Sequence, residues 1–297
     1  MMPDFDRPII LLGPTRSGKS LCAKILAATG SYSILREPIM IWDIGRPWLG
    51  AADDCRSGRE AKPAVVRRIR HALSAAHEVA RSERFVDDLP HHVFRLDFVR
   101  AVLPEARFIV VLRDPRPTLA AMKKGWLKQE NVGRMVRRKT KHGRHRLIQF
   151  SRVPATAALW AVNKVRQRLG LRKASWGPTA PGQRDFAKTH RLTQTVAYQW
   201  SQMGHYSLRA IEQLPPHHLV TVRYEDLIAR SNAALQSLAA ITAIPIEVVA
   251  EAADGVIELT RDESGLLLPD DEWRSIEPII APVRQAMGYA PDASTPN

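Results

Sequence analysis

Residues 13–20 read GPTRSGKS and directly follow the short apolar run PIILL (8–12). An apolar run of this length that ends in glycine is typical of a buried strand in a parallel sheet. The next residues, SLCAKILAAT (20–29), are good helix formers, and Gly30 ends them as glycine commonly ends a helix. The order of strand, glycine loop and helix predicts a phosphate-binding loop, because the free N–H groups and the dipole of a helix N-terminus attract anions.

The rest of the chain alternates strand and helix patterns. YSIL (32–35), FIVVL (108–112) and LVTVRY (219–224) are predicted strands, residues 60–84 and 91–104 are predicted helices, and a helix should follow the last strand as far as Ala240. The predicted fold class is α/β, with a parallel doubly wound sheet flanked by helices, like that of P-loop nucleoside-triphosphate hydrolases. Its ligand should bind at the carboxyl ends of the strands.

The formal net charge of +14 belongs to one part of the chain. Sixteen Lys or Arg residues lie between Lys123 and Lys173, against the single acid Glu130, and the remainder is close to neutral. Apolar residues at helical spacing over 155–169 predict that part of this region is helical. We therefore expect one domain over 1–297 with a basic, partly helical insertion at about 123–190.

The composition excludes some classes of site. Cys22 and Cys55 are the only cysteines and lie in no metal-ligand spacing, so we expect reduced thiols and no structural metal. No apolar run reaches the length of a membrane span, which predicts a cytoplasmic protein. Peripheral membrane contact through the basic stretch 123–173 stays open, and nucleic-acid binding ranks last because no nucleic-acid module is recognisable.

The glycine loop does not itself reveal whose phosphate it binds. An ATP or GTP enzyme also needs an aspartate after an apolar strand to organise Mg²⁺. FIVVL runs into Arg113 before Asp114, and LVTVRY reaches Glu225 and Asp226 only after an arginine. These cationic surroundings disfavour the triphosphate interpretation, although an ATP-dependent small-molecule kinase stays an alternative.

A longer series of motifs resembles the PAPS-dependent sulfotransferases, in the branch that includes bacterial and tyrosylprotein sulfotransferases. GPTRSGKSLCAKIL resembles their 5′-phosphosulfate loop, and the segment 104–122 resembles their 3′-phosphate-binding strand and helix. Four further stretches occur in the family's order: REPIMIW (36–42), WGPTAPG (176–182), AYQW (197–200) and VRYEDL (222–227). The C-terminal stretch 272–289 resembles the family's terminal helix, so the resemblance covers nearly all of the chain outside the basic insertion.

The resemblance implies a reaction and a set of residues. The donor would be 3′-phosphoadenosine 5′-phosphosulfate (PAPS), the product adenosine 3′,5′-bisphosphate (PAP), and the acceptor a hydroxyl group; no metal is required. Glu37 would be the general base, with Arg16 and Lys19 stabilising the leaving phosphate. The residues implied in donor binding are Arg16, Ser17, Gly18, Lys19, Ser20, Leu21, Arg113, Arg223 and Tyr224.

Each of these roles has a plainer structural alternative. Arg113 suits a phosphate by its planar fork, but it could pair with Asp114 instead. Glu37 could be a surface residue before a proline. Arg223 and Tyr224 could serve packing or lie in solvent.

Three positions depart from the family pattern. Lys19 stands where the family has threonine, Ala121 where it has a 3′-phosphate-binding serine, and Asp88-Leu89-Pro90 where it has Lys-x-Pro. We expect Thr118 to be a candidate replacement for the serine. We also expect Lys19 to supply from the loop the cation that is missing near position 88.

The acceptor is not encoded in a recognisable motif. Small molecules, glycans and lipids all remain possible acceptors, because the pocket loops that select them vary independently of the fold. From a different functional class, the alternative is a non-catalytic, basic peripheral-membrane or nucleic-acid-binding protein on the same fold.

Overall fold

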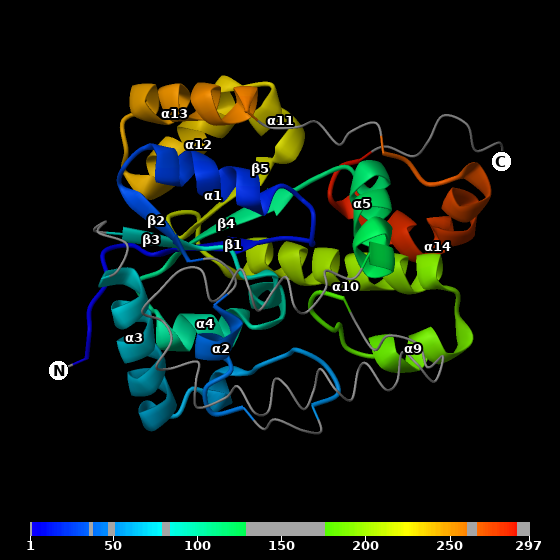
Figure 1. The fold of residues 1–297 in the computed structure, drawn as a ribbon, viewed down its shortest axis with the longest axis horizontal. Helices are drawn as coiled ribbons and strands as arrows, with labels where there is room; N and C mark the ends of the chain where they lie inside the picture. Colours follow the sequence, from blue (N-terminus) through cyan, green and yellow to red (C-terminus); the bar gives the residue numbers. More distant parts are fainter. Residues whose placement is uncertain are drawn as a thin grey trace.

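The computed structural model describes residues 2–35, 38–46, 51–78, 84–128, 176–259 and 266–289. Its centre is a sheet of five parallel strands in the order β2-β3-β1-β4-β5 (Figure 1). The strands are β1 (Ile9–Leu12), β2 (Tyr32–Leu35), β3 (Arg84–Asp87), β4 (Arg107–Leu112) and β5 (Leu219–Arg223). The predicted α/β class, with its parallel doubly wound sheet, is therefore confirmed.

Alternating side chains of β1 supply two separate hydrophobic cores. Ile9 and Leu11 join the core formed with α1 (Lys19–Ala28), α12 (Asn232–Thr242) and α13 (Ile246–Glu258). Ile10 and Leu12 face the other side. Both faces are covered because a strand at the centre of a parallel sheet is apolar on both sides.

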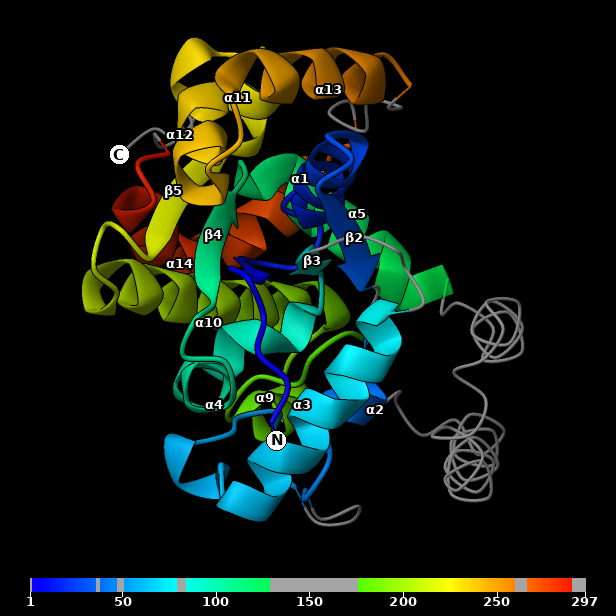
Figure 2. The same cartoon turned by 90° about the vertical axis from the view of Figure 1, so that its left-hand side faces the viewer.

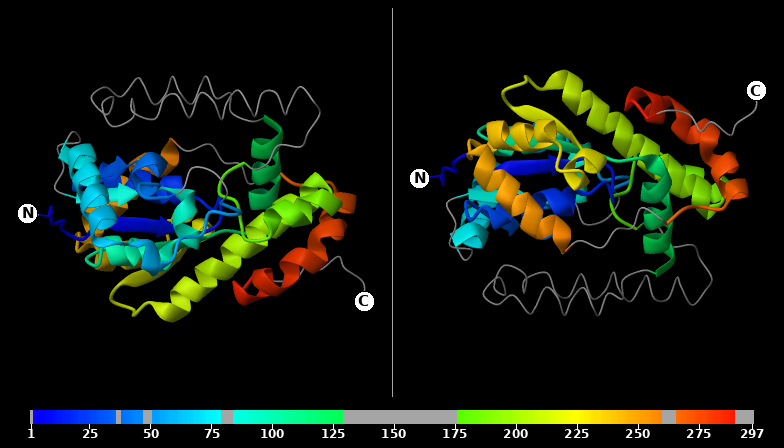
Figure 3. Two further views of the ribbon diagram at one scale, coloured as in Figure 1. Left: turned by 90° about the horizontal axis from the view of Figure 1, so that it is seen from below. Right: turned by 90° about the horizontal axis from the view of Figure 1, so that it is seen from above.

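The face of the sheet that carries Ile10 and Leu12 is covered by four helices, which include α10 (Leu192–Gln213), the longest helix in the described part of the chain. The other three are α3 (Pro63–Glu78), α4 (Leu96–Val102) and α14 (Asp270–Ala286). Figure 2 shows the two layers on opposite sides of the strands, and Figure 3 shows α14 running beside α10. The remaining elements are α2 (Ile39–Trp42), η1 (Gly58–Glu60), η2 (Pro90–Phe94), α5 (Pro115–Lys128), α9 (Gln183–Thr189) and α11 (Tyr224–Ile228).

The predicted helices are correct in place but too long. The pattern over 60–84 becomes α3, and β3 begins at the end of that range; the pattern over 91–104 divides into η2 and α4. The helix expected after β5 is interrupted at Arg230, which has a φ of 53°. Ser231 then starts α12 by accepting a hydrogen bond from the N–H of Ala234, so a capping serine marks a boundary that apolar periodicity does not reveal.

Only the two ends of the predicted insertion lie among the described residues. Residues 123–128 complete α5, and residues 176–190 form a loop followed by α9. The helical stripe expected over 155–169 lies outside the described residues. Cys22 and Cys55 are both free thiols, and burial raises the pKa of each.

In the described ranges no single helix has both the length and the apolar character needed to cross a membrane. The sharply bent pair formed by α12 and α13 meets that test only when its two helices are taken together, by length and composition.

Candidate functional site

The loop between β1 and α1 requires glycine at two positions. Gly13 has a φ of 129°, and a Cβ there would lie 2.3 Å from the carbonyl oxygen of Val111. Gly18 has a φ of 99°, and a Cβ there would lie 2.3 Å from Cδ2 of Tyr224. The backbone thus approaches β4 on one side and an aromatic ring on the other, and only glycine combines this closeness with a positive φ.

The start of α1 presents free backbone donors. Gly18 is the N-cap, and in the described part of the chain the N–H groups of Gly18, Lys19 and Ser20 have no acceptor. Two of the expected donors are already used: the N–H of Ser17 donates to the carbonyl of Pro14, and that of Leu21 donates to the carbonyl of Gly18. Of the residues implied in donor binding, Gly18, Lys19 and Ser20 therefore keep a backbone N–H without an acceptor in the described structure.

Lys19 is buried inside the loop. Its Nζ donates to the carbonyl oxygens of Gly13 at 2.8 Å and Pro14 at 2.6 Å. Desolvation lowers the pKa of Lys19 to about 8, although the charge of Asp88 acts in the opposite direction. The ammonium group therefore lies within the loop in a state that loses its proton more easily than an exposed lysine.

Arg113 lies directly after β4, which pairs with β1, and its side chain reaches the loop. The guanidinium donates to the carbonyl of Arg16 at 3.2 Å and lies over the ring of Tyr224, with 4.1 Å between its central carbon and the ring centroid. Among the described residues, its Nε and Nη2 are buried with no hydrogen-bond partner, as is the hydroxyl of Ser17. Buried donors without partners are costly, so these atoms indicate a place for an anionic ligand.

Asp114 is not the partner of Arg113 in the described structure. Asp114 accepts from the N–H of Arg116 in the first turn of α5, and its own N–H donates to Glu225. The structural alternative for Arg113, an ion pair with Asp114, is therefore not what the contacts show.

Arg223 has contacts that differ from its expected role at the nucleotide. Its Nη2 donates to the carbonyl oxygens of Met287 at 3.0 Å and Gly288 at 3.4 Å. Its guanidinium also lies over the ring of Tyr289. These contacts hold the end of α14 against β5 and favour a structural role for Arg223.

Of the remaining expected residues, Glu37 cannot be placed, whereas Ala121 and Thr118 lie in α5. Glu37 lies outside the described residues, and only the end of β2 at Leu35, beside β3, is seen. Ala121 is buried in α5. The hydroxyl of Thr118 donates to the carbonyl of Asp114, the residue before that helix, so the suggestion that Thr118 replaces the family serine is not supported by its contacts.

The segment after the basic region lies beside the loop. Gln199, fully buried in α10, donates to the carbonyls of Trp176 and Pro178 and accepts from the indole N–H of Trp126. Arg16 lies over the ring of Trp176, 5.6 Å from its centroid. The motifs WGPTAPG and AYQW, quoted separately in the sequence, thus form one unit next to the phosphate-binding loop.

A buried ionic network around Asp54 also contacts the segment 176–182, at Thr179. Asp54 accepts from Arg46, Arg95 and the N–H of Thr179, and its own N–H donates to the carbonyl of Thr179. His91 lies 3.8 Å from this carboxylate, and burial lowers the pKa of His91 to about 3. Sequence reasoning missed this network because its members are far apart in the chain and form no motif.

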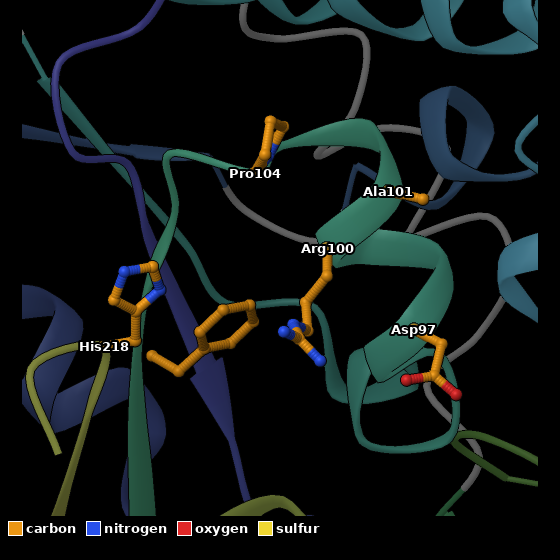
Figure 4. Close-up of a pocket in the computed structure, with 6 residues that line it drawn as sticks. Asp97, Arg100, Ala101, Pro104 and His218 are labelled. Carbon is orange, nitrogen blue, oxygen red and sulfur yellow. The ribbon is translucent and has the colours of Figure 1, made fainter. Parts of the chain in front are cut away.

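The described residues contain no group of three or more His, Cys, Asp or Glu side chains that could hold a metal ion. A surface pocket, drawn in Figure 4, lies near the amino end of β4, whereas the loop follows the carboxyl end of β1. Its lining residues are Asp97, Arg100, Ala101, Pro104, Phe108 and His218. We therefore place the candidate site at the loop.

Comparisons with known proteins find sulfotransferases. A family model described as "Sulfotransferase family" matches residues 8–152, a range that includes the loop and Arg113. No curated protein matches the chain.

Two solved structures are among those similar to this chain. Sulfotransferase STF9 from Mycobacterium avium superposes with a TM-score of 0.55 at 13% identity, covering 97% of this chain and 78% of that one. The sulfotransferase domain from the curacin biosynthetic pathway has a TM-score of 0.49 at 13% identity, covering 97% of this chain and 99% of that one. The chain is thus similar to the sulfotransferase family over residues 8–152, and its parallel sheet and superposition show the P-loop-like fold.

Proposed function

We propose that the protein transfers a sulfuryl group from PAPS to a hydroxyl-bearing acceptor, a small molecule, glycan or lipid. The observation that carries this proposal is the set of unpartnered donors at the loop. The Ser17 hydroxyl and two nitrogens of Arg113 are buried without partners in the described structure, beside three free N–H groups at the start of α1. We further propose that residues 1–297 form one sulfotransferase domain.

The donor set fits a nucleotide that carries phosphates at both ends of its ribose. The amides of Gly18, Lys19 and Ser20, with the Ser17 hydroxyl, suit the 5′ side because they surround the helix N-terminus. Arg113 suits the 3′-phosphate because its two unpartnered nitrogens can bind two phosphate oxygens. We assign Tyr224 a supporting role, because its ring contacts both Gly18 and Arg113.

The loop residues also suit the chemistry. PAPS, when bound, supplies an activated sulfuryl group. Donors that are already oriented in the free protein stabilise charge that grows on a leaving phosphate, and so lower the barrier more than they strengthen ground-state binding. Lys19 and the exposed Arg16 are the cations we assign to this task.

We retain Glu37 as the proposed general base. Its support is its place in the chain: two residues upstream, β2 ends at Leu35, paired with Asp87 of β3 at the carboxyl edge of the sheet, where the loop also lies. A carboxylate that reaches this edge could accept the proton of an acceptor hydroxyl.

One observation favours a second candidate, an ATP-dependent kinase. Asp88 directly follows the buried strand β3 and is hydrogen-bonded to Ser20 of the loop, which is where a kinase of this loop type would need an aspartate. The sequence argument considered only the strands at 108–112 and 219–224, and Asp88 follows a different strand.

Thermal unfolding with separate ligands tests the proposal. A ligand that binds the native state alone must raise the melting temperature, so PAP should raise it without metal, and less so in Arg113→Met. Arg67→Met, an exposed arginine on α3, is the matched control and should respond like the wild type. A shift with ATP and Mg²⁺ but none with PAP would replace the proposal by the kinase, and a shift with neither would favour a non-catalytic binding protein.

A further inference from the structure

The surface pocket drawn in Figure 4 lies near the amino end of β4, away from the phosphate-binding loop. It has a volume of about 320 Å³, at the small end of the range for ligand pockets. α4 and the residues after it form one side, and Phe108 of β4 and His218, just before β5, form the other. About 16 Å of extended strand separates Phe108 from Arg113, so the pocket is distinct from the site at the loop.

Part of the pocket lining is apolar and is held in place without a ligand. Phe108 is buried, and its N–H donates to the carbonyl of His218 at 2.8 Å. β4 pairs here with both β1 and β5, so the backbone that carries the ring is fixed from two sides. Ala101 and Pro104 add further apolar surface. A surface that is already formed can bind a ligand with little loss of conformational entropy.

Basic side chains surround this apolar surface. Arg100 and His218 both line the pocket, and Figure 4 shows them on opposite sides of it. Burial lowers the pKa of His218, and the nearby charges of Arg107, His217 and Arg100 lower it further. The ring of His217 is T-shaped to that of His218, with 4.5 Å between the two centroids. Four basic side chains therefore gather at one small pocket.

The described residues supply little negative charge to balance them. Glu105, the acid nearest to Arg107 in the chain, is paired with Arg70 at 2.7 Å. Asp97 is the one acid in the described lining, and it forms no ion pair with Arg100, although the two lie three residues apart on α4. A concave surface with an excess of one charge attracts ligands of the opposite charge. The pocket therefore favours an anion.

We propose that this pocket binds a small organic anion, with one sulfate, phosphate or carboxylate group on a compact apolar body. The oxyanion would lie between Arg100 and His218, because a guanidinium can donate two hydrogen bonds to such a group. The apolar body would pack on Phe108. The inference goes beyond the proposed function and is independent of it, since no residue of the loop takes part.

Binding of phenyl sulfate to the full chain tests the proposal, with the ring signals of His218 followed by nuclear magnetic resonance. His218→Gln assigns these signals by removing them. We expect a saturable shift with phenyl sulfate, weaker binding of inorganic sulfate, which lacks the ring, and weaker binding of phenol, which lacks the charge.

The same titration at several pH values gives an independent measure. A bound anion offsets the charges of Arg100, Arg107 and His217, so it should raise the pKa of His218, against the smaller opposing effect of Asp97. The affinity for phenyl sulfate should accordingly increase as the pH falls through the titration of His218. Phenyl sulfate keeps its charge over this range, so the dependence must come from the protein.

Two variants and two controls make the test specific. Arg100→Met should weaken binding of phenyl sulfate by about threefold to tenfold, as expected for a partly exposed charge pair. Ala101→Phe, at an exposed position of α4, should fill the pocket without changing its charge and should also weaken binding. Arg274→Met, at an exposed position of α14, should behave like the wild type. Arg113→Met should also keep the His218 response, because it alters only the loop.

The outcomes separate this inference from the proposed function. A His218 response that is lost in Arg113→Met, or that persists unchanged in Arg100→Met and Ala101→Phe, would overturn the pocket as the site. A response as strong with phenol as with phenyl sulfate would overturn the anionic class of the ligand, and equal affinities for phenyl and inorganic sulfate would overturn the apolar body. A protein that gives the expected His218 response but does not bind PAP would contradict the proposed function alone.

Discussion

Arg113 and Tyr224 lie face to face, with the guanidinium carbon 4.1 Å from the ring centroid, although 110 residues of sequence separate them. The ring in turn meets the backbone of Gly18, so β4, β5 and the loop are linked through one aromatic side chain. This contact orients the arginine while two of its nitrogens stay unpartnered in the described structure. An arginine held in this way can bind a phosphate with little loss of side-chain entropy.

Gly18→Ala should disturb this arrangement. A methyl group there would lie 2.3 Å from the Tyr224 ring at a φ of 99°, so we expect a loss of about 1–3 kcal/mol in unfolding free energy and weaker PAP binding. Gly255→Ala is the control, because its methyl would meet nothing within 4 Å and helix propensity favours alanine by up to about 1 kcal/mol. Denaturant unfolding measures both; an unchanged midpoint for Gly18→Ala would contradict the close contact.

Lys19 should make stability depend on pH above neutrality. Its pKa is lowered from 10.5 to about 8 by burial, so between these values the unfolded chain binds more protons than the native protein. The free energy of unfolding should therefore rise as the pH rises from about 8 towards 10.5. Below about pH 8 Lys19 should add no pH dependence, because it is protonated in both the native and the unfolded state. Urea unfolding of wild type and Lys19→Met at several pH values gives the difference.

The exposed Lys24 on the same helix provides the control for that experiment. Lys24→Met should keep the pH dependence of the wild type, whereas Lys19→Met should lose the rise between pH 8 and 10.5. Parallel curves for wild type and Lys19→Met would show that the ammonium group is not buried as described.

Gln199→Leu should release the segment beside the loop. It removes two hydrogen bonds to the carbonyls of Trp176 and Pro178 and leaves the indole N–H of Trp126 unpaired, at an expected cost of about 2–4 kcal/mol. Gln213→Leu, exposed at the end of α10, should cost little. Hydrogen exchange of residues 176–182 should accelerate in Gln199→Leu alone. Equal protection in both variants would contradict the claim that Gln199 holds this segment in place.

Arg223→Met should show whether Arg223 has a structural role or binds the nucleotide. Loss of its bonds to Met287 and Gly288 should lower unfolding free energy by about 1–2 kcal/mol. The PAP affinity of the folded variant should stay within about twofold of wild type, since a difference that small is below 0.5 kcal/mol. A tenfold loss of affinity without loss of stability would restore the role that the family resemblance implies for Arg223.

The strands and the loop could be predicted because their signals are local. β2 matches its predicted range residue for residue, and β4 begins one residue before FIVVL, since β-branched runs bounded by turn residues read clearly. The loop amides of Ser17 and Leu21 could not be assigned, because their use inside the loop depends on the observed turn geometry.

The site's long-range contacts were harder to foresee. Asp88 was recognised only as a departure from a family lysine, because the four-residue strand before it is too short to stand out and its partner Ser20 is 68 residues away. Asp54 accepts a hydrogen bond from Thr179, 125 residues away, and no sequence motif predicts a contact over that separation. Neither the base Glu37 nor most of the basic region lies among the described residues, so both stay predictions.

The most direct test of the central claim asks whether Arg113 recognises a 3′-phosphate. Calorimetry compares PAP with adenosine 5′-monophosphate, which differs by that phosphate alone, on wild type and Arg113→Met. The account predicts that the 3′-phosphate strengthens binding to the wild type by about tenfold or more and adds little in the variant, as a charge-assisted hydrogen-bonded pair would. Equal affinities of the wild type for the two nucleotides would contradict it.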